Sequence, residues 1–157
     1  MTAEIRRCDG LKLRTARSAD LPLVLALLSH AQLPTAGVAE SLPHFIVAER
    51  EGELIGVAGL EVYGASALLR SVAVVDRWRG SGVGRTLIDR ALDEARQAGI
   101  DDVFLLTTTA EHYFPRFGFS CVSRAEVGEE VRASVEFQEA CPASAVVMRK
   151  RLGVDRR

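Results

Sequence analysis

The segment of this sequence with the clearest chemistry is rich in glycine, RWRGSGVGRTL at residues 77–87. It follows an apolar run and precedes a segment with helical periodicity. Each glycine in regular structure carries an entropic cost of about 0.5–1 kcal/mol, so glycines this dense indicate that the backbone itself must approach something closely. A strand, a glycine-rich turn and a helix start together favour anion binding, because N–H groups and the positive end of the helix dipole converge there.

We expect consecutive main-chain amides to bind phosphate oxygens, those of Gly80, Ser81, Gly82, Val83 and Gly84. The side chains of Arg79 and Arg85 would add positive charge beside them. Each contact between the dipole and a charge contributes about 0.3–1 kcal/mol. The segment lacks the Gly-Lys-Ser/Thr ending of nucleoside-triphosphate loops, and its spacing does not fit the dinucleotide fingerprint. A helix start without a ligand is the structural alternative.

The elements that must position this loop can be read from apolar periodicity and turn residues. The predicted strands cover residues 11–16, 45–50, 53–63, 67–75, 102–108, 120–125 and 144–150. Helices are predicted at 18–31, with Ser18 or Asp20 as cap, at 38–42, at 82–99, and at 110–119, where Pro115 and Gly118 end a short one. Gly52 supplies the positive φ of a hairpin turn. Residues 126–137 stay undecided between helix and strand.

This order of elements predicts an α/β (α+β) fold, with a mixed, mostly antiparallel sheet flanked by helices. The predicted organisation is a leader at residues 1–10, one domain at 11–152 and a short tail at 153–157. With 157 residues, 48% of them hydrophobic, the chain can bury a core. The net charge of -1 gives no electrostatic reason to expect nucleic acid or an anionic membrane as partner.

The chain also lacks the marks of several other classes of protein. No apolar run reaches the roughly 18 residues of a membrane span, and the N-terminus does not resemble a signal peptide. Cys8, Cys121 and Cys141 have neither metal-ligand spacing nor an even number for disulfides. We expect Cys121 and Cys141 to be buried, inert thiols, no metal site, and a cytoplasmic location.

Two stretches carry a resemblance to a known family. RSVAVVDRWRGSGVGRTLIDRALDEARQAG at 70–99 resembles motif A of the GNAT N-acetyltransferases, and YFPRFGF at 113–119 resembles their motif B. The resemblance implies acetyl-CoA as cofactor, with its diphosphate on the amides of residues 80–85. It also implies that the backbone of Val72, Ala73 and Val74 pairs with the pantetheine arm like an extra strand. The motif A strand would be splayed from the strand VFLLTT, with the thioester in that gap.

The family resemblance implies direct acetyl transfer to an amine through a tetrahedral intermediate. The Val72 N–H would stabilise the thioester oxygen, and such a donor is typically worth on the order of 10²–10³ in rate. Phe114 stands where the family usually has a thiol-protonating tyrosine, so Tyr113 is the candidate acid, with packing on the sheet as its alternative. The usual strand glutamate is absent, which leaves Glu61, Glu111 or a water chain to take the amine proton.

For the acceptor, LLTTTAEHYFPRFGF resembles the acetyltransferase domain of bacterial N-acetylglutamate synthases. LPTAGV, EVYGASALLRSVAV, LLTTTAEHYF and CPASAVVM are similar to acetyltransferases found with arsenic-resistance genes, which implies detoxification by N-acetylation of an amino-acid-like arsenical. Pro142 replaces the first family's carboxylate-binding arginine. The candidate substrate residues are Arg70, Ser71, Thr107, Thr108 and Ser144.

Arg70 suits a carboxylate, and its alternative is an ion pair with Glu61. For Thr107 and Thr108, the alternative to substrate binding is a structural role through strand propensity and helix capping. Two other functions stay open, a CoA-binding or regulatory module without turnover and a protein or peptide N-acetyltransferase. A homodimer is possible.

Overall fold

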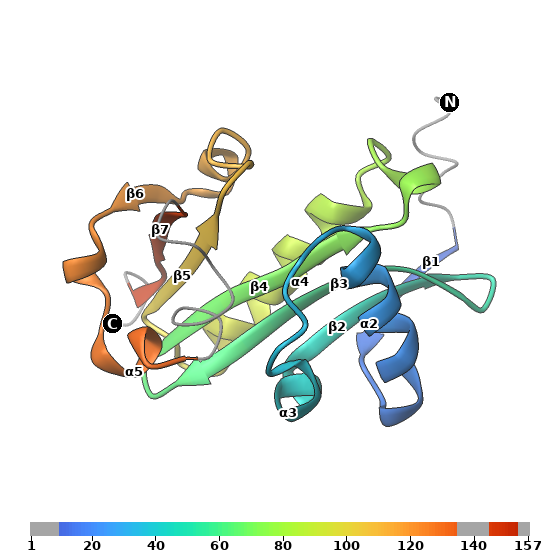
Figure 1. Cartoon of the computed structure of the whole chain (residues 1–157), viewed down its shortest axis with the longest axis horizontal. Coiled ribbons are helices and arrows are strands. Elements are labelled where there is room, and N and C mark those ends of the chain that lie inside the picture. Colours follow the sequence, from blue (N-terminus) through green and yellow to red (C-terminus); the bar gives the residue numbers. More distant parts are fainter. Residues whose placement is uncertain (1–9, 135–144, 154–157) are drawn as a thin grey trace. The chain divides into compact units, whose positions relative to one another are not determined.

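The computed structural model describes residues 10–134 and 145–153. Its described strands form a mixed sheet in the order β1-β2-β3-β4-β5-β7-β6 (Figure 1). β4 and β5 pair in parallel, whereas β1–β2, β2–β3, β5–β7 and β6–β7 pair antiparallel. The strands are β1 (Leu11–Thr15), β2 (Phe45–Arg50), β3 (Glu53–Tyr63), β4 (Ser66–Val74), β5 (Asp102–Thr107), β6 (Ser120–Val122) and β7 (Val146–Arg151). The predicted α/β class and mixed sheet are confirmed.

The chain divides into two compact units that share β3, β4 and one long helix. The first unit comprises Met1–Gly59 and Ser71–Ala91, and the second comprises Leu60–Arg70 and Leu92–Arg157. The α-helices of the described residues are α2 (Leu21–His30), α3 (Val38–Ser41), α4 (Val83–Gln97) and α5 (Glu129–Arg132). Among the described residues, no helix combines the length and the apolar character that crossing a membrane requires.

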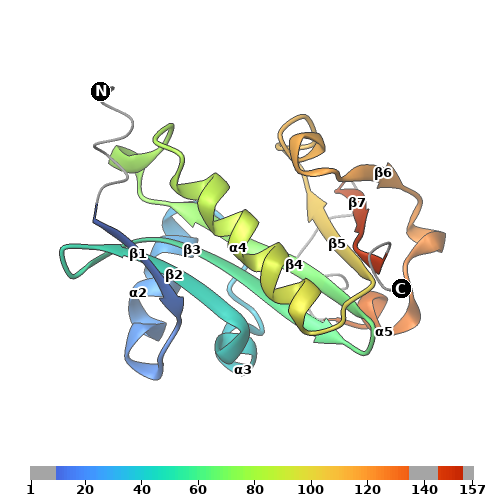
Figure 2. The ribbon, with the colours of Figure 1, turned by 180° about the vertical axis from the view of Figure 1, so that it is seen from behind.

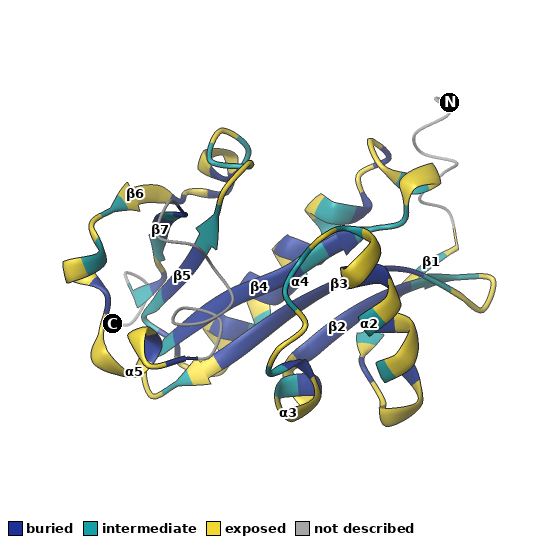
Figure 3. Ribbon diagram, in the orientation of Figure 1, coloured by how far each residue is buried: buried dark blue, intermediate teal, exposed yellow. Residues whose placement is uncertain are grey.

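In the first unit, helices cover both faces of the strands. α2 and α3 lie on one face and the start of α4 on the other (Figures 1 and 2). The strand interiors between them are buried (Figure 3). Gly56 of β3 allows α4 to approach, since a Cβ there would lie 2.9 Å from Leu87 Cδ1 and 3.2 Å from Val83 Cγ1. The predicted apolar face of α4 is confirmed, with its members all buried: Val83, Leu87, Ile88, Ala91, Leu92 and Ala95.

The hairpin between β2 and β3 turns at two residues in the left-handed region. Gly52 has the predicted positive φ of +80°, and Glu51 has +53°. Two consecutive positive φ values are typical of the tight turns whose twist matches that of the flanking strands. Asp20 precedes α2 without a side-chain cap on it. Its carboxylate instead accepts a hydrogen bond from the Arg17 amide at 2.7 Å.

In the second unit, β5 pairs with β7 over its whole length, and a separate core lies beside this pair. That core joins Leu68, Phe104, Val127, Val131 and Val147. Val131 comes from α5, so part of the undecided segment 126–137 is helical. Strand β6 lies at the end of the sheet order and spans three residues, Ser120–Val122, rather than the predicted 120–125.

Two further predictions about the second unit are wrong. The predicted helix at 110–119 is a short 3-10 helix, Phe114–Phe117, and Pro115 lies at its start rather than its end. Proline fits the first turn of a helix because the N–H that it lacks has no helical acceptor there. Gly118, at φ +93°, does end this helix. Cys121 is exposed, not buried, because it lies on the edge strand β6; Cys8 and Cys141 lie outside the described residues.

Candidate active site

The glycine-rich segment lies in the first unit, between β4 and α4, as the sequence predicts. Gly80 and Gly82 have φ values of +78° and +94°, a region that other L-residues rarely adopt. Both glycines are exposed, and a Cβ built on Gly80 would have no atom within 4 Å. The segment therefore presents bare backbone to the solvent at the start of a 15-residue helix.

The amides of the first turn of α4 have no hydrogen-bond acceptor within the helix. The Thr86 amide is the first to form an i to i−4 bond in this region, to the Gly82 carbonyl at 3.0 Å. The amides of Val83, Gly84 and Arg85 precede it, and first-turn amides have no acceptor within a helix. With the helix dipole behind them, they are suited to an anion.

Ser81 differs from its neighbours in this segment. Its amide donates to the Trp78 carbonyl at 3.3 Å, and its hydroxyl donates to the same carbonyl. Its residue surface is 5% exposed. Ser81 therefore stabilises the turn from inside. The sequence predicts that its amide binds phosphate like those of its four neighbours, but this amide is already hydrogen-bonded to the Trp78 carbonyl.

The two arginines beside the segment are exposed. Arg79 Nε lies 3.4 Å from the Val74 carbonyl and 3.4 Å from Asp76 Oδ1. Arg85 is an exposed residue in the first turn of α4. Exposed pairs of this kind contribute little to stability, so Arg79 can exchange Asp76 for another anion at small cost.

β4 contains a backbone irregularity that the sequence did not reveal. Ser71 has a φ of +61° and is buried. A non-glycine residue in this region is uncommon and marks a local break in the strand. Val72, Ala73 and Val74 follow it directly, and Ala73 packs in the core of the first unit. The division between the two units also falls between Arg70 and Ser71.

The parallel ladder between β4 and β5 is short. Its pairs run from Ser66↔Asp102 to Leu68↔Phe104, so the described residues Leu69–Val74 of β4 lie beyond the ladder. Within the second unit the ladder therefore ends before β4 reaches Leu69 and Arg70, which agrees with the predicted splaying of the two strands. Among the described residues, the ladder pairs of β4 with β5 do not include Val72–Val74.

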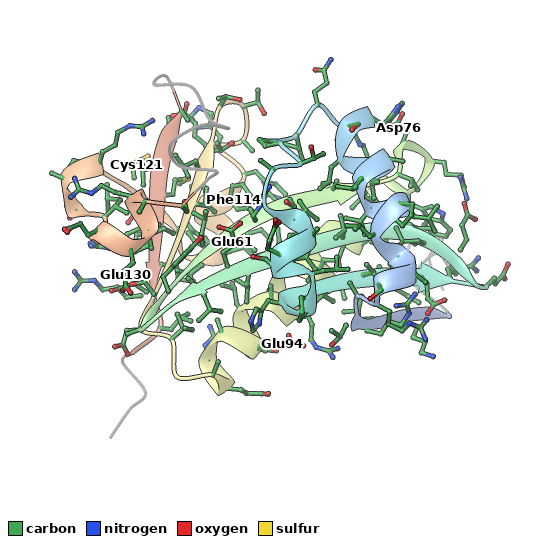
Figure 4. All side chains as sticks on the ribbon, turned by 60° about the horizontal axis from the view of Figure 1, so that its bottom comes forward. Glu61, Asp76, Glu94, Phe114, Cys121 and Glu130 are labelled. Atoms are coloured by element: carbon green, nitrogen blue, oxygen red, sulfur yellow. The ribbon has the colours of Figure 1, made fainter. Side chains whose placement is uncertain are left out.

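The second unit contains a buried polar network centred on Glu61 of β3, a residue labelled in Figure 4. Glu61 Oε2 accepts a hydrogen bond from Arg70 Nη1 of β4 at 2.6 Å, and the two side chains are 5% and 0% exposed. Glu61 Oε1 accepts another from the Tyr63 hydroxyl at 2.5 Å. Burial, followed by this bond to Glu61, raises the pKa of Tyr63, while a hydrogen bond from Ser134 lowers it. Of the two interpretations of Arg70, the structure shows the ion pair.

Sequence reasoning missed Tyr63 and Ser134 in this network. Tyr63 had a usable signal, because residues two apart on a strand share one face and Tyr63 follows Glu61 by two. Ser134 follows a short helix in the segment left undecided, and no local pattern links it to β3. Glu61, Tyr63 and Arg70 are therefore partly predictable as a cluster, and Ser134 is not.

Two of the other predicted side chains of the second unit, those of Tyr113 and Thr107, are held in structural contacts. The Tyr113 ring lies 5.4 Å from the rings of Phe114 and Phe117, and the Arg116 guanidinium lies 4.4 Å above it. Thr107 Oγ1 accepts a hydrogen bond from the Ala110 amide at 2.9 Å, a local turn contact rather than a helix cap, because the 3-10 helix begins only at Phe114. Thr108 is exposed, and Ser144 lies outside the described residues.

The predicted residues thus fall into two groups, each within one unit. The cofactor group, Val72–Val74 with residues 79–85, lies with Ser71 in the first unit. Glu61, Arg70, Thr107, Thr108 and Tyr113 lie in the second. Within the described part of the chain, no three His, Cys, Asp or Glu side chains are grouped as a metal site would need.

Residues 41–121, 81 of the 157, match the sequence profile of the acetyltransferase (GNAT) domain. The chain belongs to the GNAT acetyltransferase family. An amino-acid acetyltransferase of Mycobacterium tuberculosis is 32% identical over 153 residues, which cover 90% of this GNAT chain and 83% of the relative. The predicted family is confirmed, and these matches support the predicted enzyme class, N-acetyltransferase.

Other relatives of this GNAT chain match it over only part of their own length. An amino-acid acetyltransferase of Pasteurella multocida is 27% identical over 80% of the chain, which spans 31% of that relative. An uncharacterized N-acetyltransferase of Chlorobaculum tepidum is 31% identical over 55% of the chain, which spans 56% of the relative. The chain thus spans about a third to about half of these two proteins.

Solved structures agree with the GNAT fold. N-acetylglutamate synthase of Neisseria gonorrhoeae, solved with coenzyme A and N-acetyl-glutamate, superposes with a TM-score of 0.78 at 24% identity, over 90% of this chain and 35% of that one. A Mycobacterium tuberculosis protein in complex with CoA superposes with a TM-score of 0.77 at 26% identity, over 90% of this chain and 99% of that one.

Proposed function

We propose that this GNAT domain is an acetyl-CoA-dependent N-acetyltransferase whose acceptor is the primary amine of a small, amino-acid-like molecule. The observation that carries the proposal is the exposed backbone of Gly80 and Gly82, followed by first-turn amides of α4 without helical acceptors. Two solved neighbours are complexes with coenzyme A, which supports the same cofactor for this chain.

The residues present fit this cofactor. The amides of Gly82, Val83, Gly84 and Arg85 would hold the diphosphate, with Gly80 and Ser81 shaping the turn. The guanidinium groups of Arg79 and Arg85 would add charge. The backbone of Val72, Ala73 and Val74, beyond the β5 ladder, would pair with the pantetheine arm. When bound, acetyl-CoA supplies the acetyl group as a thioester.

Transfer requires three tasks from the chain. The Val72 N–H would donate a hydrogen bond to the oxygen that gains charge when the amine attacks, a contribution on the order of 10²–10³ in rate. Glu61 is the proposed acceptor of the amine proton. Its two carboxylate oxygens already accept bonds from Arg70 and Tyr63, so we place a water between it and the amine. Tyr113 is the proposed proton donor to the departing thiolate.

An amino-acid-like acceptor is supported by the relatives named amino-acid acetyltransferases, of which the Mycobacterium tuberculosis protein is matched over 83% of its length. Arg70, Ser71, Thr107, Thr108 and Ser144 are the proposed substrate residues. Since Arg70 is ion-paired with Glu61, a substrate carboxylate would have to join that pair rather than meet a lone guanidinium. A role in arsenic detoxification, a cytoplasmic location and a homodimer stay predictions.

The test is thiol release from acetyl-CoA with a panel of amino acids, glutamate analogues, aminoglycosides and short peptides. We expect saturable release with at least one small amine above the rate without amine. Release with peptides alone would favour the protein N-acetyltransferase. Flat rates across the panel, with coenzyme A still bound in calorimetry, would favour the binding module and contradict catalysis.

A matched pair of glycine variants tests the cofactor site itself. Gly80 and Gly99 both have positive φ values, +78° and +81°, and open space around a Cβ. Asp tolerates this region better than most residues. Gly80→Asp places a carboxylate beside the diphosphate and is expected to raise KM for acetyl-CoA about tenfold or more. Gly99→Asp, after the far end of α4, is expected to leave that KM unchanged. Equal effects of the two would contradict the site.

A further inference from the structure

Residues 76–79, which lead from β4 to the first glycine of the glycine-rich segment, are connected to three other elements of the first unit. Asp76 lies 3.1 Å from His30 Nε2 of α2 and 3.4 Å from Arg79 Nε. Arg77 forms an ion pair with Glu53, the first residue of β3. The Arg50 guanidinium, at the end of β2, lies 5.2 Å from the centroid of the Trp78 ring. The approach to the loop is thus held from the β2–β3 hairpin and from α2.

Trp78 links these contacts to the loop itself. Its ring is partly buried and faces Arg50, whose side chain is 27% exposed. Its carbonyl accepts hydrogen bonds from both the amide and the hydroxyl of Ser81, the buried residue inside the turn. A chain of contacts therefore runs from Arg50 through Trp78 to Ser81, directly before Gly82.

The two ion pairs contribute less than the Arg50–Trp78 contact to holding residues 76–79 in place. The side chains of Arg77 and Glu53 are 60% and 54% exposed, and those of His30 and Asp76 are 68% and 65% exposed. Exposed ion pairs contribute little. Of these three contacts, the one between Arg50 and Trp78 is the least exposed to solvent. It also involves an indole, the best ring for cation–π attraction.

We infer that Trp78 is a positioning residue for the cofactor, held by Arg50 across the β2–β3 hairpin, and this rests on the proposed function. A loop already in its binding conformation loses less entropy when a ligand binds. If the contact is removed, the binding-competent loop becomes a smaller fraction of the population, and the apparent Kd rises in inverse proportion to that fraction. For a cation–π contact near the surface, the expected rise is at most about two- to fivefold.

The experiment compares wild type, Arg50→Ala, Trp78→Leu and the double variant, with the Kd for coenzyme A measured by calorimetry. Each single variant is expected to raise Kd about two- to fivefold. The double variant is expected to match Trp78→Leu rather than multiply the two effects, because both act through one contact. In kinetics, KM for acetyl-CoA rises while KM for the amine and kcat stay unchanged. Trp78→Phe, which keeps an aromatic face, is expected to retain most of the affinity.

The controls separate positioning from general damage. Arg96→Ala removes an exposed arginine of α4 that pairs with Asp93 at 3.0 Å, and it is expected to change none of these constants. An unchanged Kd in Trp78→Leu, multiplied effects in the double variant, or an equal rise of KM for the amine would each overturn the inference. Arg50→Ala in the Trp78→Phe background repeats the cycle should Trp78→Leu not fold. If wild type itself does not bind coenzyme A, the proposed function fails instead.

Discussion

Removing one partner of the Glu61–Arg70 pair should destabilise the protein more than removing both. The side chains are 5% and 0% exposed, and the two atoms lie 2.6 Å apart. Breaking a buried ion pair leaves a charge without compensation and typically costs about 3–5 kcal/mol. We therefore expect Glu61→Gln and Arg70→Met each to lower the free energy of unfolding by about that amount, a large share of a typical domain's stability.

The double variant Glu61→Leu/Arg70→Met removes both charges. Replacing a buried pair by apolar residues is often neutral or stabilising, but here the Tyr63 hydroxyl loses its acceptor. Tyr63 is half-buried and its hydroxyl keeps a hydrogen bond with Ser134, so the double variant should lose at most about 1–3 kcal/mol, well below the sum of the singles. Adding Tyr63→Phe to the double variant should restore part of it.

Urea unfolding at pH 7 measures these differences, with an unchanged m-value as the check that the compared states stay the same. Stability rather than turnover is the readout, because both residues belong to the proposed active site. Single variants within about 1 kcal/mol of wild type, or a double variant that loses the full sum, would show that the pair is not a coupled, desolvated unit.

Two further stability predictions concern packing and one ion pair of the first unit. In Gly59→Ala the new Cβ would overlap the fully buried Phe45 ring, so the free energy of unfolding should fall by about 1–3 kcal/mol. Gly128→Ala, which has open space around the new Cβ, should stay within about 0.5 kcal/mol of wild type. Equal losses in the two variants would contradict the packing. The hydrogen bond from Arg14 lowers the pKa of Asp20 to about 2, so the carboxylate contributes about 2 kcal/mol of stability above pH 3.8, and this is lost as pH falls through about 2. Asp20→Asn should therefore be less stable than wild type at pH 7 in urea unfolding, and the gap should narrow from pH 5 to pH 2; a gap independent of pH would refute this.

Most of the fold could be predicted because its signals are local. The apolar stripe of α4 is set by residues three and four apart, and the hairpin at Gly52 by one turn residue between two apolar runs. The glycine-rich segment could be predicted for the same reason, since glycines this dense are costly unless the backbone needs positive φ values or a close approach. In the structure this segment lies between the end of β4 and the start of α4, as predicted, and Gly80 and Gly82 have positive φ values.

The features that the sequence did not predict depend on contacts between distant segments, or on residues that favour more than one local structure. Ser71 adopts a positive φ although serine has no preference for that region, so tertiary context must impose it. Pro115 can end a helix or begin one, and the sequence alone favoured the wrong choice. Cys121 is exposed because β6 lies at the end of the strand order, which its own apolar neighbours do not reveal.

The most direct test of the account is an amide NMR titration of the whole chain with coenzyme A and, separately, with pantetheine, which lacks the diphosphate. We predict that the amides of Gly82, Val83 and Gly84 shift with coenzyme A and not with pantetheine, while those of Val72–Val74 respond to both. If the amides of the glycine-rich segment stay unmoved at saturating coenzyme A, or move equally with pantetheine, the claim that they bind the diphosphate is contradicted.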